Sequence, residues 1–61
     1  MITVDVDLKE MGKIIEELKQ TTLYLKEISG GMQCVVRNCD RILASIKMLE
    51  LNISDVLEFL E

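Results

Sequence analysis

The sequence predicts an all-α protein, a two-helix antiparallel hairpin that turns at Ser29-Gly30-Gly31. Two stretches, 8–29 and 32–60, carry apolar residues at alternating steps of three and four, which is the spacing of an amphipathic helix. A pair of glycines separates them, and glycine just past a helix is a common stop signal because it adopts the left-handed conformation without penalty. Proline, which would break a long helix, is absent.

The chain of 61 residues is long enough for one domain, residues 1–61. A domain this small buries only about 60% of the surface of its unfolded chain, so it usually needs disulfides, a metal or a partner chain. Two cysteines and no histidine disfavour a disulfide scaffold and most zinc sites. We therefore expect self-association, with a four-helix bundle if the assembly is a dimer. Whether it is a dimer or a tetramer stays open.

The charge pattern restricts the partners. The net charge is −4, and the seven basic residues are scattered among acidic ones, which disfavours nucleic acid and anionic membrane surfaces. The start of the chain lacks the basic and apolar regions of a signal peptide, and no stretch approaches about 18 uninterrupted apolar residues. We expect a cytoplasmic protein with no nucleic-acid or membrane partner. Export without a signal peptide stays open.

Residues 1–7 alternate between apolar and polar side chains, with Ile2, Val4 and Val6 on one side. Period two with β-branched residues predicts a short extended segment, which either packs on the helices, pairs with a second copy or frays. Asp7 then marks the start of the first helix. Its carboxylate is placed to accept from the N–H three residues on, and Glu10 is placed to reach back, as in a capping box.

An apolar seam follows the predicted first helix. It consists of Leu8, Met11, Ile15, Leu18 and Leu25, with Thr22 as a polar interruption, and Ile14, Thr21 and Ile28 widen it on one flank. Gly12 also lies in this stretch, where glycine costs up to about 1 kcal/mol relative to alanine. A continuous helix through both glycines of the turn would cost roughly 2 kcal/mol, so we favour the hairpin, with the continuous helix as the alternative.

The seam of the predicted second helix is more regular. It consists of Val35, Cys39, Ile42, Ile46, Leu49, Ile53, Val56 and Leu60; Val36, Leu43 and Leu57 form a row on one flank, and Asn38, Ser45 and Asn52 line the other. An apolar face this wide exceeds what one antiparallel neighbour covers. The polar row is either a solvated edge or a row that sets the register between chains. The polar residues at 52–55 favour caps, so an interruption of the helix there stays open.

The end of the second helix is a candidate surface for another protein. If the chain folds about the glycines, residues whose numbers add up to roughly 61 lie opposite each other, so Ile15 would face Ile46. The first helix would then end too early to cover Leu57, Phe59 and Leu60, and acidic residues surround them.

No pattern points to catalysis, a cofactor, a metal or a small-molecule substrate. Cys39 lies on the seam and is expected to be a small buried hydrophobic residue, whereas Cys34 lies off it and is expected to be exposed. We expect a non-catalytic protein–protein interaction module, a small homo-oligomeric helical adaptor or regulator whose first partner is itself. Two alternatives stay open: a small exported helical-hairpin effector of a bacterial secretion system, and an antitoxin-like or DNA-associated regulator, which the acidic charge disfavours.

Overall fold

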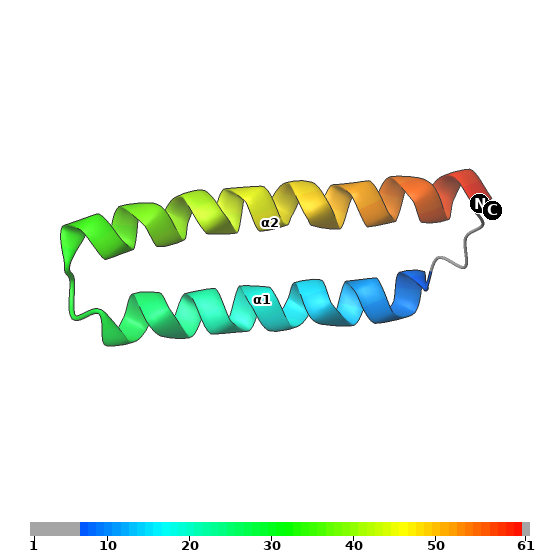
Figure 1. Ribbon diagram of the computed structural model, residues 1–61. Helices are drawn as coiled ribbons and strands as arrows, with labels where there is room; N and C mark the ends of the chain where they lie inside the picture. The colour runs from blue at the N-terminus through cyan, green and yellow to red at the C-terminus, as the bar shows by residue number, and fades with distance from the viewer. Residues whose placement is uncertain (1–6, 61) are drawn as a thin grey trace, which may run out of the picture.

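A computed structural model describes residues 7–60 of the chain, apart from the side chain of Leu60. Helix α1 spans Leu8–Ile28 and helix α2 spans Gln33–Leu60. The two helices lie side by side and antiparallel (Figure 1). The predicted all-α hairpin is therefore confirmed, and the alternative of one continuous helix is wrong. The extended segment predicted before Asp7 lies outside the described residues.

Asp7 caps the start of α1 as the sequence predicts, but the return bond from the Glu10 side chain is absent among the hydrogen bonds of the described residues. The Asp7 Oδ1 atom accepts a hydrogen bond from the backbone N–H of Glu10 at 2.9 Å. The Asp7 carbonyl accepts from the N–H of Met11 at 3.0 Å, which begins the helical ladder. A cap of this kind contributes about 1 kcal/mol.

The turn depends on two glycines in the left-handed region. Gly30 has φ 63° and Gly31 has φ 86°. Before them, the Ser29 N–H donates to the carbonyl of Leu25 at 3.0 Å, and the Ser29 hydroxyl donates to the carbonyl of Lys26 at 2.7 Å. These bonds satisfy two carbonyls in the last turn of α1, and the left-handed glycines then reverse the chain.

The same substitution is expected to have opposite effects at two glycines. Gly12 lies inside α1, and a Cβ built there meets no atom within 4 Å, so Gly12→Ala should raise the free energy of unfolding by up to about 1 kcal/mol. Gly31→Ala should lower it by about 1–2 kcal/mol, because an L-residue is strained at positive φ. Urea unfolding of the two variants measures the difference. Stabilisation by both substitutions would contradict a left-handed turn.

Helix α2 runs from Gln33 to Leu60 as one α-helix, so the interruption considered at 52–55 is wrong. Asn52, Ser54 and Asp55 are all exposed. Their side chains are therefore free to bond to water, and the α-helix continues through this segment.

The core between the helices is narrow. Its buried apolar side chains in the described residues are Ile15, Cys39 and Ile46, at 8%, 1% and 3% exposure. Thr22 is also buried, and its hydroxyl donates to the carbonyl of Leu18 at 2.7 Å. The buried Thr22 hydroxyl thus finds a hydrogen-bond acceptor within its own helix, as a buried hydroxyl group requires.

Two ion pairs join the helices: the Nζ atom of Lys19 lies 3.7 Å from Glu50, and that of Lys26 lies 2.7 Å from Asp40. The residue numbers add up to 69 and 66, not to the expected value near 61. Side chains on a helix lean toward its N-terminus, so each lysine of α1 contacts a residue nearer the C-terminus of α2. Being solvent-exposed, such pairs contribute about 0–1 kcal/mol each.

Candidate interaction surface

The line of contact between α1 and α2 has two different edges. With 100° per residue, Leu49 and Glu50 lie on opposite sides of the buried Ile46. The Glu50 edge is bridged by the ion pairs with α1, next to the half-buried Val36 and Leu43 of α2. A smaller hollow of about 150 Å³ lies on this edge, between Gly12 and Glu50. The Leu49 edge has no ion pair among the described residues and carries apolar side chains.

The apolar groove, as we name the open edge, consists of Met11, Leu18 and Leu25 of α1 and Ile42, Leu49 and Val56 of α2. Each of these side chains is between 41% and 46% exposed. They share this exposure because within each helix they repeat every seven residues, which returns a side chain to nearly the same direction.

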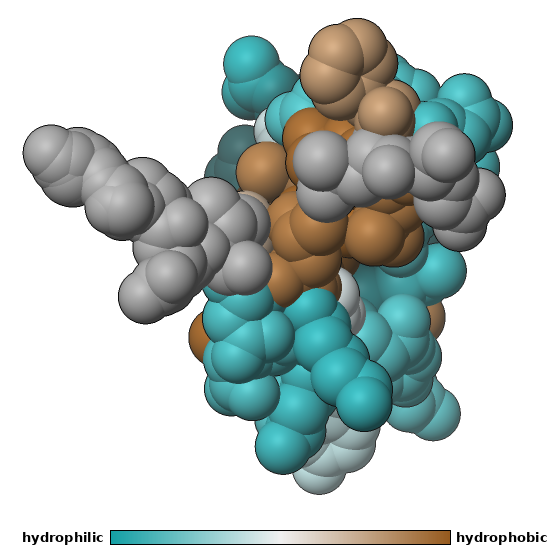
Figure 2. All heavy atoms as spheres, turned by 90° about the vertical axis from the view of Figure 1, so that its right-hand side faces the viewer, coloured by the Kyte–Doolittle hydropathy of each residue, from teal (hydrophilic) through white to brown (hydrophobic). Residues whose placement is uncertain are grey.

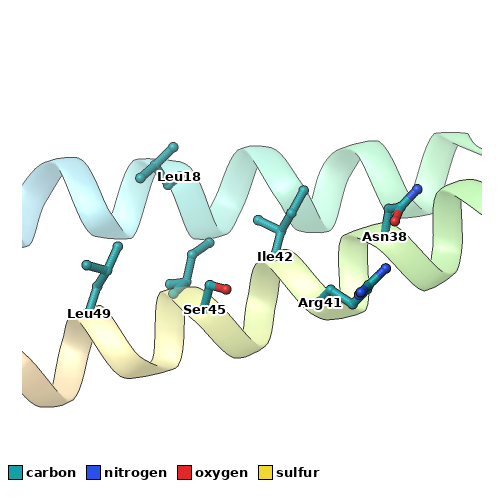
Figure 3. A pocket seen from close by; sticks show the side chains of 7 residues that line it. Leu18, Asn38, Arg41, Ile42, Ser45 and Leu49 are labelled. Atoms are coloured by element: carbon teal, nitrogen blue, oxygen red, sulfur yellow. The ribbon is translucent and has the colours of Figure 1, made fainter.

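A hollow of about 490 Å³ lies in the middle of the apolar groove. Figure 3 shows Leu18 on α1, with Ile42 and Leu49 projecting from α2 toward α1. Asn38, Arg41 and Ser45 line the α2 side of the hollow. The surface is therefore a shallow apolar floor with a polar rim, which suits another side-chain surface better than a small polar ligand.

The predicted seam residues fall into three groups. The buried ones are Ile15, Cys39 and Ile46, the half-buried ones are Leu8, Val35 and Ile53, and the exposed ones are the six residues of the apolar groove. The side chain of Leu60, the last member of the seam, is outside the described residues. Almost half of the predicted seam is thus left uncovered, because a single neighbouring helix covers only a narrow stripe of each surface.

A row of residues borders the apolar groove on each helix. Ile14, Thr21 and Ile28 lie next to it on α1, and Asn38, Ser45 and Asn52 lie next to it on α2; all six are exposed. The sequence shows both rows but not that they border the same groove. That depends on which way each helix faces its neighbour.

The end of α2 forms a second, smaller apolar surface. Leu57 is 46% exposed and Phe59 is 89% exposed, and α2 extends past the first residue of α1 (Figure 1). Figure 2 looks at this end of the molecule and shows hydrophobic side chains over α2 and hydrophilic ones over most of α1. Glu58 and Asp55 lie on the same turns of α2 and are exposed.

The two cysteines lie where the sequence predicts: Cys34 is exposed and Cys39 is buried, and neither forms a disulfide. Among residues 7–60, no three His, Cys, Asp or Glu side chains are grouped so that they could hold a metal ion. Neither α1 nor α2 contains a stretch apolar enough to cross a membrane.

Comparison with known proteins gives no relative for this chain: no protein-family model, no curated protein and no solved structure matches it. The surface of the hairpin is therefore the feature from which a function can be inferred.

Proposed function

We propose that this protein is a non-catalytic protein–protein interaction module, a small homo-oligomeric adaptor or regulator that self-associates through its apolar groove. The observation that carries the proposal is the apolar groove itself. Six aliphatic side chains, all 41–46% exposed, form one continuous surface. Isolated exposed hydrophobic residues are normal on a monomer, but a contiguous patch marks an interaction site.

The narrow core supports this proposal. Ile15, Cys39 and Ile46 are the buried apolar side chains among the described residues, and a domain this small usually gains stability from a partner chain. Two hairpins packed face to face would thus acquire the shared core that one hairpin lacks, in the form of a four-helix bundle.

The end of α2 suits a second partner. Phe59 lies on the part of α2 that extends past α1 and is almost fully exposed, and exposed aromatic side chains are frequent anchors of protein interfaces. We propose Leu57, Phe59 and Leu60 as the surface for another protein, which gives the homo-oligomer its role as an adaptor.

Sedimentation equilibrium tests the self-association directly. At about 10–100 μM, we expect a species of about 14 kDa, twice the chain mass of 7.0 kDa or a higher multiple of it. Melting temperature should also rise with protein concentration, because association stabilises only the folded chain. A well-folded species of 7.0 kDa at every concentration would rule out the homo-oligomer.

A further inference from the structure

The two rows that border the apolar groove are each symmetrical about their middle residue. On α1 the row reads Ile14, Thr21, Ile28, and on α2 the part of the row that lies opposite α1 reads Asn38, Ser45, Asn52, with Phe59 continuing it beyond the start of α1. In both rows the outer residues are identical, the middle residue carries a hydroxyl group, and the spacing is seven residues. A row of this kind matches a second copy of itself that runs in the opposite direction.

The middle residues of the two rows lie at nearly the same level of the hairpin. The numbers of Thr21 and Ser45 add up to 66, as do those of Lys26 and Asp40, which are joined by the 2.7 Å ion pair. One axis perpendicular to the helices therefore passes close to both hydroxyl-bearing residues. A symmetrical dimer has one two-fold axis, about which each surface patch meets its own copy, and an axis at this level would make each row meet itself.

We propose that two copies pair through the apolar groove about a two-fold axis at the level of Thr21 and Ser45. Helix α1 then packs antiparallel to α1 of the partner subunit, and α2 packs antiparallel to α2 of the partner subunit. The inference rests on the self-association proposed above and specifies its geometry. The occupant of the groove is thus a second copy of the chain.

The axis brings groove residues together as well. Leu18 and Leu25 lie three residues before and four residues after Thr21, so Leu18 meets Leu25 of the partner subunit. Ile42 and Leu49 stand in the same relation to Ser45, so Ile42 meets Leu49 of the partner subunit. The exposed aliphatic side chains thus cover one another and close the hollow of the groove.

The bordering rows pair like with like about the same axis. Ile14 meets Ile28 of the partner subunit, and Asn38 meets Asn52 of the partner subunit, so amides bond to amides. The other face-to-face arrangement, in which α1 packs on α2 of the partner subunit, places isoleucines against asparagines. It would bury amide groups opposite side chains that cannot bond to them, which is unfavourable. The structure therefore favours pairing of equivalent helices.

Cysteine cross-linking tests this geometry in the full chain. Cys34→Ser removes the exposed thiol, and the remaining Cys39 is buried. In that background, Thr21→Cys and Ser45→Cys are each expected to give covalent dimers with a short bis-maleimide. Facing thiols have an effective concentration in the millimolar range, so at about 10 μM protein the cross-linking should be roughly 100 times faster than between free molecules.

Gln20→Cys and Ala44→Cys are the matched controls. Each is exposed and neighbours a test position but points away from the apolar groove, so each should react with the reagent without giving dimers. Cross-linking that requires a mixture of Thr21→Cys and Ser45→Cys proteins would overturn the proposed axis and leave self-association standing. If all four variants sediment as monomers before the reagent is added, both the proposed axis and the self-association are overturned.

Discussion

Leu49→Glu is expected to raise the dissociation constant of the homo-oligomer by about 100-fold or more. Leu49 lies in the middle of the apolar groove and is 41% exposed in the hairpin. Covering the remaining apolar surface contributes about 1 kcal/mol per leucine, and in a symmetrical dimer both copies lose it. Two carboxylates would also be moved from water into the interface, which costs several kcal/mol when they find no partner.

Leu51→Glu is the matched control for this substitution. Leu51 has nearly the same exposure, 46%, and lies two residues further along α2, about 200° away around the helix. It introduces the same charge outside the apolar groove, so the sedimenting mass should stay that of the parent protein. Equal dissociation of the two variants would show that net charge, and not the groove, controls the assembly.

Ile46→Ala is expected to lower the free energy of unfolding by about 2–5 kcal/mol, because it leaves a cavity in the core. Ile46 is 3% exposed and is one of three buried apolar side chains among the described residues. A loss of this size is a large fraction of the stability of a small domain. Thermal unfolding followed by circular dichroism at a fixed protein concentration measures it.

Met48→Ala provides the comparison for the core substitution. Met48 is 58% exposed and lies on the outer side of α2, so its truncation should change the free energy of unfolding by no more than about 0.5 kcal/mol. Comparable losses at positions 46 and 48 would mean that the line of contact between α1 and α2 lies elsewhere.

The two helices and the turn could be predicted from the sequence alone. Both follow from local chemistry. The helix starts at Asp7 because its side-chain oxygen accepts from a free backbone N–H, and the chain reverses at Gly30 and Gly31 because residues without a Cβ adopt positive φ at low cost. Such preferences involve only residues near in sequence, so they can be read without knowing the fold. The burial of Cys39 and exposure of Cys34 were also predictable, because helical periodicity places them on different faces.

The tertiary structure decided which part of each seam is buried and which part stays open. Periodicity shows that Ile46 and Leu49 share a face, but the direction from which α1 approaches makes the first core and the second surface. The same direction puts the ion pairs of Lys19 and Lys26 on one edge and both symmetrical rows on the other. These features depend on the relative rotation of two helices, which is set by packing across the chain and leaves no signal in the sequence of either helix alone.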